Sequence, residues 1–233
     1  MRQIFQIGLC WLALVNVTAA APAATVTGSV LLWQEQEPGI EPYPNRMLIT
    51  TDHLRSDDGE DDSDYLLFER RTGVLYSVSH ERRALLVVTA EPLPAAAGPR
   101  PEVQVDIATD PDAPLIGGQA VQAIRLHSGD ALCMQAMVVP GLLPEAVAAL
   151  REMRARLAGR QYRDLYKTPE EFRTPCFLAN YVYEMDRALQ TGLPIRESVS
   201  GGVRRALRDY RTGQTLPAAL FELPADYRRE EIP

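Results

Sequence analysis

Short apolar runs separated by turn sequences fill the chain from residue 25 to residue 90. The runs are rich in β-branched and aromatic residues, and several alternate between apolar and polar positions. They cover 25–34, 46–54, 64–71, 73–79 and 82–90. Because short connections join antiparallel neighbours, this pattern predicts an antiparallel meander with one strand for each run.

A proline-rich stretch follows at 91–118 and contains six of the 18 prolines. Proline excludes a long helix or central strand, but the alternating segment 101–107 can pair at a sheet edge. Two further strands are expected at 119–127 and 131–139, joined by a turn at Ser128–Asp130.

The hydrophobic period then changes from two residues to that of a helix. One stripe holds Leu143, Val147, Leu150, Met153 and Leu157. A capping box at 168–171 and a restart at 174–175 predict further helix. That helix is expected to reach 189, with Phe177, Tyr181, Met185 and Leu189 on one face and Gly192 as its cap.

Strands return near the C-terminus. The segments 194–200, 203–212 and 216–223 are predicted strands, and the polar end at 224–233 is expected to fray. The pattern as a whole predicts an α+β fold of roughly ten strands and two or three helices. Residues 24–233 are expected to form a single domain.

The N-terminal segment has the layout of a cleavable signal peptide, assigned to residues 1–23. A basic residue at position 2 precedes an apolar run of 14 residues, Ile4–Val17, and small residues allow cleavage between Ala20 and Ala23. Its removal takes away Arg2 and Cys10, so the net charge becomes −8. The remaining Cys133 and Cys176 are predicted to form a disulfide in a periplasmic protein.

Net charge and the absence of known motifs argue against several classes of function. An acidic balance of 24 basic to 31 acidic residues argues against a nucleic-acid partner. The sequence has no Cys-x-x-Cys or His-x-x-x-His spacing for zinc and no Gly-x-Ser-x-Gly elbow. The turn His127–Asp130 holds the residue types of a hydrolase triad, but a triad converges from separate segments. No cofactor, metal or catalytic residue is therefore predicted, and the protein is not expected to be an enzyme.

An acidic run between residues 52 and 64 offers the one candidate for a cation. Its central carboxylates are Asp57, Asp58, Asp61 and Asp62, and calcium binds several oxygens from one loop. The spacing does not match an EF-hand, so a solvated acidic hairpin is the preferred interpretation.

Four segments carry a likeness to a known family: MLITTDHLRSDDG at 47–59, YLLFERRTGVLYSVSHERRALLVV at 65–88, Ile116–Ala120 with the following AIRL, and LFELPADYR at 220–228. They resemble the LolA-like superfamily of periplasmic lipoprotein carriers. The resemblance extends to uncharacterised exported proteobacterial proteins. It implies an incomplete β-barrel, in which a curved antiparallel sheet is covered on its concave side by two or three helices.

The resemblance also implies a cavity, which in the carriers receives acyl chains. The leading hypothesis is a non-enzymatic periplasmic protein that binds a lipid, an acyl chain or a lipoprotein; its ligand-binding residues are not identified. The alternative is an envelope protein–protein interaction or sensor-regulating module, docking through the outer face of the sheet or the acidic hairpin. An uncharacterised enzyme is the third.

Overall fold

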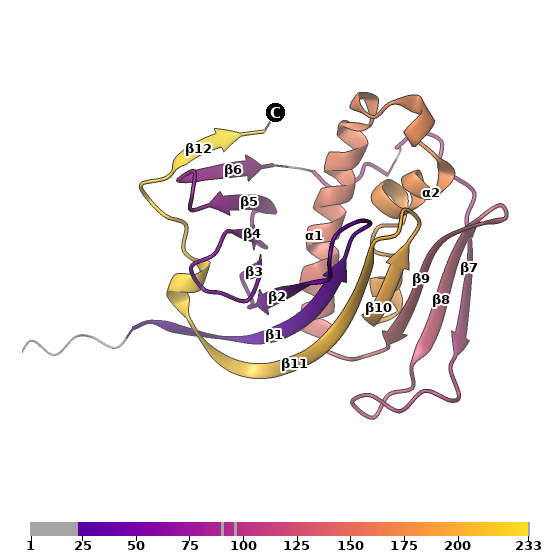
Figure 1. Ribbon diagram of the computed structural model, residues 1–233, viewed down its shortest axis with the longest axis horizontal. Coiled ribbons are helices and arrows are strands. Elements are labelled where there is room, and N and C mark those ends of the chain that lie inside the picture. The colour runs from indigo at the N-terminus through magenta and orange to yellow at the C-terminus, as the bar shows by residue number, and fades with distance from the viewer. Residues whose placement is uncertain (1–22, 90, 96, 233) are drawn as a thin grey trace, which may run out of the picture.

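A computed structural model describes residues 23–89, 91–95 and 97–232 of the chain, so the predicted signal peptide lies outside the described residues except for residue 23. One mixed sheet of 12 strands forms this part of the molecule (Figure 1), in the order β12-β6-β5-β4-β3-β2-β1-β11-β10-β9-β8-β7. The strands are β1 (Thr25–Gln36), β2 (Tyr43–Ile49), β3 (His53–Asp57), β4 (Tyr65–Glu69), β5 (Val74–Ser79), β6 (Ala84–Val88), β7 (Gln104–Thr109), β8 (Gln122–Ser128), β9 (Ala131–Val139), β10 (Leu193–Val199), β11 (Arg204–Pro217) and β12 (Arg228–Glu231).

Helix α1 (Pro144–Arg163) lies in the hollow of the curved sheet, with β2–β6 on one side of it and β8–β10 on the other (Figure 1). Its apolar stripe packs against concave-side residues of the sheet, among them Leu31, Leu54 and Phe68. Burial of these side chains holds the helix on the concave face. Among the described residues, no helix is both long and apolar enough to span a membrane.

The outer face of β2–β6 is also covered. Leu48, Leu67 and Val78 point away from α1 and pack under the 3₁₀ turn η4 (Ala218–Phe221). Arg55 lies under the same cover, donates a hydrogen bond to the carbonyl of Leu220 at 2.9 Å, and lies 3.9 Å from the ring centroid of Tyr65. The C-terminal segment therefore seals this half of the sheet on its second side.

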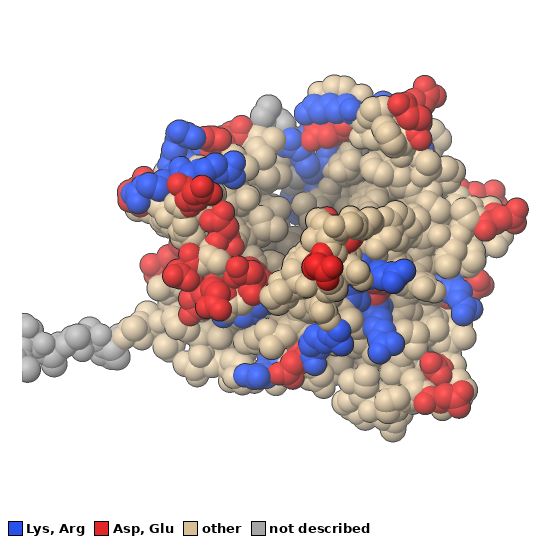
Figure 2. Space-filling view, viewed as in Figure 1, with Lys and Arg blue, Asp and Glu red and all other residues tan. Residues whose placement is uncertain are grey.

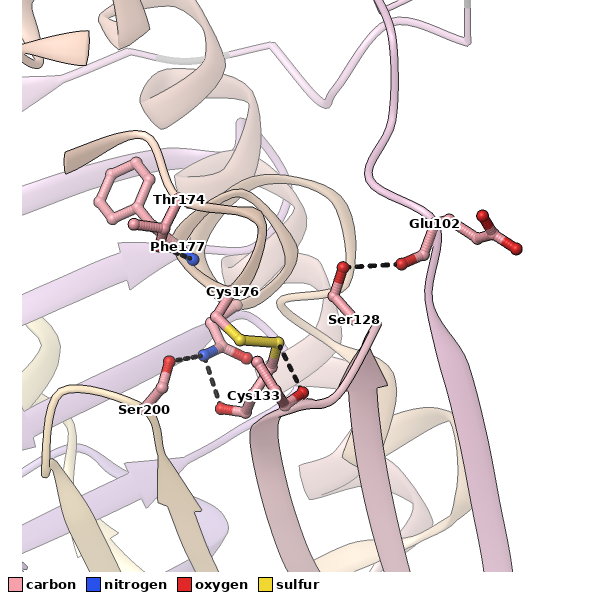
Figure 3. Close-up of a disulfide and its surroundings, with 9 residues drawn as sticks. Glu102, Ser128, Cys133, Thr174, Cys176, Phe177 and Ser200 are labelled. Atoms are coloured by element: carbon pink, nitrogen blue, oxygen red, sulfur yellow. Dashed lines mark hydrogen bonds between the residues drawn. A yellow bond between two sulfur atoms is a disulfide. The ribbon is translucent and has the colours of Figure 1, made fainter. Parts of the chain in front are cut away.

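A disulfide joins Cys133 of β9 to Cys176 of α2 (Pro175–Leu178), as the sequence predicts (Figure 3). Thr174 caps α2 by accepting a hydrogen bond from the backbone N–H of Phe177. The side chain of Asn180 donates to the carbonyl of Cys133 at 2.8 Å. Cross-link and hydrogen bond together tie the helical segment to the sheet.

The α+β class and most strands agree with the sequence, including the edge strand β7 within the proline-rich stretch. Three strand predictions are wrong. The run 46–54 is split between β2 and β3, because a turn at residues 50–52 reverses the chain. Residues 216–223 are not one strand, since η4 folds over the outer core. The end of the chain does not fray: β12 pairs in parallel with β6, which makes the sheet mixed instead of antiparallel.

The second helix is also shorter and more broken than predicted. The capping box at 168–171 is followed only by the 3₁₀ turn η2 (Glu170–Phe172). After α2 the chain continues as a π-helical turn, η3 (Ala179–Tyr183), and then α3 (Arg187–Thr191). The disulfide and Asn180 fix this segment to β9, so tertiary contacts replace the regular helix that the period suggests.

Candidate functional site

In the described chain, the outer face of β8–β11 lacks the cover that seals β2–β6 and carries a groove of about 760 Å³. We name it the arginine groove after four exposed side chains that line it: Arg125, Arg196, Arg204 and Arg208. The other lining residues are Gln34, Gln36, Pro42, Ala123, Ile124, Gln135, Ala136, Met137, Glu197, Ser198, Arg205 and Ala206. Figure 2 shows basic side chains gathered at the centre of the visible face, over β10 and β11.

Strand register places these arginines on one side of the sheet. Arg125 pairs with Gln135, which pairs with Ser198, which in turn pairs with Arg204. Directly paired residues of neighbouring strands share a face. The four residues therefore form a row across the sheet, which continues to the exposed Asp106 of β7 opposite Arg125 and to Gln36 of β1 opposite Arg204.

Two irregularities in the ladder lie beside the other two arginines. The β1–β11 register passes from Leu32–Asp209 to Trp33–Leu207, so Arg208 is the extra residue of a bulge. The β9–β10 register skips Ile195, directly before Arg196. Bulges bend a strand and change the direction of a side chain, and here both arginines line the same groove.

The charge of the groove is not neutralised from within the described residues that line it. Glu197 is the one carboxylate among them, but it is buried on the concave side. There it accepts hydrogen bonds from Arg154 of α1 at 2.9 and 3.2 Å and forms an ion pair with Arg205 at 3.1 Å. Burial raises the pKa of Glu197, but the charges of Arg154 and Arg205 and the hydrogen bonds from Arg154 outweigh this and lower it to about 2.

Three of the four arginines lack a protein partner in the described chain. Within residues 23–89, 91–95 and 97–232, Arg125, Arg196 and Arg204 make no ion pair or side-chain hydrogen bond, and Arg208 donates to the side chain of Gln34. A guanidinium presents a planar set of donors that suits a carboxylate or a phosphate. The arrangement is suited to binding an anionic group.

The four carboxylates of the candidate cation cluster have other partners or are exposed. Asp57 is buried, accepts from Arg46 at 2.8 and 2.9 Å and from Arg55 at 2.7 Å, and so is neutralised by two guanidinium groups. Asp61 also accepts from Arg46 at 2.8 Å.

The other two carboxylates do not complete a site. Asp58 accepts from the Ser63 hydroxyl and the Glu60 N–H, and Asp62 is exposed. Among the described residues, no group of three acidic, histidine or cysteine side chains is arranged to hold a metal ion. The acidic run is therefore a hairpin in which Arg46 and Arg55 bind Asp57, and Arg46 also binds Asp61.

On the concave side, α1 packs on the apolar residues of the sheet, and a pocket of about 320 Å³ is lined by Ser56 of β3, Leu66 of β4 and Ser77 of β5, among others. The space between the helix and β4–β6 measures about 10 Å³ and is lined by Phe68, Leu75, Val88, Met153 and Leu157, with Gly73 and Arg156. A cavity of this size holds at most one water molecule, so this one space is too small for an acyl chain.

Sequence reasoning missed the arginine groove, although a signal for it was present. Arg196 and Ser198, and Arg204 and Ala206, alternate along two consecutive predicted strands, which puts arginines on one face without an acidic counterpart. The contribution of Arg125 depends on a pairing through β9 that the sequence does not show.

Comparison with known proteins leaves the chain without a family. No protein-family model matches it, and no curated protein matches it. A crystal structure of an uncharacterized conserved protein from Thermus thermophilus is similar at 10% identity with a TM-score of 0.46, covering 89% of this chain and 91% of the other. Two structures of PNGF-II match at 9% and 7% identity, with TM-scores of 0.41 and 0.39. They cover 88% of this chain, which spans only 31% and 32% of theirs. These similarities are too distant to assign a family or an activity.

Proposed function

We propose that this protein is a non-enzymatic, periplasmic docking module with a LolA-like half-barrel, which binds an acidic partner in the arginine groove. The observation that carries the proposal is the convergence of four exposed arginines, three of them unpaired in the described chain, on one groove of about 760 Å³. Docking through the outer face of the sheet is one of the functions that the sequence suggests. The disulfide fits an oxidising compartment.

The charge of the groove is opposite to the net charge of the chain, and this contrast favours an acidic partner. The chain as a whole is acidic, with a net charge of −7, so it repels anions at long range. On such a surface, a basic groove attracts a negatively charged partner locally. It therefore determines the orientation in which this partner binds. We expect binding to weaken as salt screens the exposed charges.

Fluorescence anisotropy with labelled poly-L-glutamate tests the proposal. The wild-type protein should bind the probe, and a triple variant with Arg125→Gln, Arg196→Gln and Arg204→Gln should lose at least about tenfold in affinity, since charge-assisted hydrogen bonds are among the stronger polar contacts. The matched control removes three exposed arginines outside the groove, with Arg71→Gln, Arg82→Gln and Arg229→Gln. Absence of binding, or equal losses in both triple variants, would overturn the proposal.

Lipid binding on the concave side is the second candidate, because the small space under α1 has mainly apolar walls. Occupation of the space under α1 requires this helix to move away from the sheet, which breaks the contacts of Arg154 with Glu197. Native mass spectrometry of protein purified without detergent tests it: a co-purified lipid supports this candidate, and a ligand-free mass counts against it.

A further inference from the structure

The spacing of the arginines restricts which ligands can bind in the groove. The inference drawn from this spacing rests on the proposed function. Strands lie about 4.8 Å apart and rise about 3.3 Å per residue. Arg196 pairs with Ala206, which lies two residues from Arg204 and two from Arg208. The Cα atoms of Arg196 and Arg204 are therefore roughly 8 Å apart, and Arg208 follows Ala206 on the opposite side from Arg204, at the bulge of β11.

An extended peptide has a similar repeat. Residues two apart in a strand point to the same side and lie about 6.6 Å from each other. The long arginine side chains can span the small difference between this repeat and their own spacing. Carboxylates at every second residue would then meet Arg204, Arg196 and Arg208 in turn, whereas Arg125 lies two strands away from Arg196, on β8.

The remaining lining residues favour a peptide over a nucleic acid. Gln34, Gln36 and Gln135 each carry an amide that both donates and accepts, which complements the N–H and C=O groups of a peptide backbone. No aromatic residue is among the described residues that line the groove. Single-stranded nucleic acids are usually held by bases stacked on aromatic rings, so this groove lacks their usual platform.

From these contacts we infer that the arginine groove holds an extended acidic segment of another protein, with carboxylates on alternate residues, lying along β10 and β11. The guanidinium groups bind its carboxylates, and the glutamine amides bind its backbone.

A second copy of the chain fits the groove less well. Its acidic hairpin has carboxylates at alternate positions, namely Asp58, Glu60, Asp62 and Asp64. The hairpin is folded into a turn, however, in which Asp58 accepts from the Ser63 hydroxyl at 2.6 Å and Asp64 accepts from the N–H of His80. Its carboxylates do not have the spacing of an extended strand.

The test compares two labelled peptides of identical composition by fluorescence anisotropy. One alternates aspartate and serine over about twelve residues, and the other groups the aspartates in one block; a length of this order spans the groove at the rise of a strand. We expect the wild-type protein to bind the alternating peptide at least about tenfold more tightly than the block peptide. Arg196→Gln should abolish this preference, whereas Arg71→Gln, an exposed control outside the groove, should leave it unchanged.

Other outcomes overturn the inference and separate it from the proposed function. Equal affinity for the two peptides, or binding of inorganic polyphosphate but of neither peptide, overturns the inference while leaving an anion-binding groove. Failure of every probe, poly-L-glutamate included, overturns both. Analytical ultracentrifugation of the protein alone covers the remaining occupant: self-association that Arg196→Gln abolishes would assign the groove to a second copy and overturn the inference.

Discussion

Strands β2–β6 and strands β8–β11 belong to one sheet, but their outer faces carry different chemistry. Over β2–β6 the outward positions are largely apolar, and the turn η4 with the residues after it packs on them. Over β8–β11 the outward positions include arginine, glutamine, serine, alanine and Met137, and a groove remains open. The same alternation of side chains thus builds a second core in one half and an exposed polar surface in the other.

This contrast indicates which part of the molecule supports the fold and which is available for binding. Phe221 and Leu220 are buried, and their removal would expose apolar surface to water. The arginines of the groove are exposed, and three of them make no ion pair or side-chain hydrogen bond within the described chain. We expect substitutions in the covered half to reduce stability and substitutions in the open half to reduce binding.

Phe221→Ala should produce the largest effect. Phe221 is 7% exposed and stacks near His53 with a centroid distance of 5.7 Å. Truncation of a buried phenylalanine costs about 3–5 kcal/mol, through lost burial and the cavity that remains. Urea unfolding followed by circular dichroism measures the loss. Phe172→Ala, at a position 62% exposed, is the control and should change stability by less than about 0.5 kcal/mol; similar losses in the two variants would contradict the assignment of an outer core.

The disulfide comes next, because it supports the half of the sheet whose outer face is open. Replacing Cys133 and Cys176 together by serine should lower the free energy of unfolding by about 2–4 kcal/mol, since the bridge closes a long loop in the unfolded chain. Guanidinium unfolding of wild type with and without reductant should show a similar difference. Alkylation of the unreduced protein should label neither Cys133 nor Cys176. Two labelled cysteines would refute the bridge.

Acid should weaken the ion pair between α1 and the sheet. The pKa of Glu197 is about 2 in the folded protein and 4.5 in its ordinary state, so the stabilisation is present above pH 4.5 and is lost as the pH falls toward 2. At a pH of about 3 the loss from this group amounts to about 2 kcal/mol. The measurement compares unfolding free energies at neutral pH and at this acid pH for wild type and for a double variant, Arg154→Met with Glu197→Gln. The double variant should lose less; an equal loss would show that Glu197 does not contribute.

The sequence predicted the core of this fold better than its edges. Period-two alternation located most strands, and the period change located α1, because both patterns come from burial along a single element. The parallel pairing of β12 with β6 was missed, since a polar tail has no such pattern and its position depends on the carbonyl and N–H groups that the sheet edge offers. The break after α2 was missed for a similar reason, because the cross-link to Cys133 decides the local geometry.

The candidate site shows the same division. The disulfide followed from composition, because two cysteines remain after the predicted signal peptide is removed. The acidic run is a candidate cation site by sequence because it holds many carboxylates within a few residues. The contacts by which Arg46 and Arg55 neutralise Asp57 depend on strand pairing and side-chain direction, which the sequence does not show. The arginine groove depends on the register of four strands and on two bulges, neither of which a single sequence specifies.

The smallest expected change in stability gives the sharpest test of the contrast between the two halves. The triple variant with Arg125→Gln, Arg196→Gln and Arg204→Gln should unfold within about 0.5 kcal/mol of wild type, because exposed side chains contribute little to folding when they make few contacts. Removing neighbouring like charges can even raise stability slightly, since arginines on one face repel one another. Urea unfolding measures this, beside the anisotropy experiment on the same sample. A loss as large as that of Phe221→Ala would mean that the arginines support the fold, and the open half of the outer face would then be structural like the covered half. Unchanged stability with lost affinity for poly-L-glutamate would assign these arginines to binding.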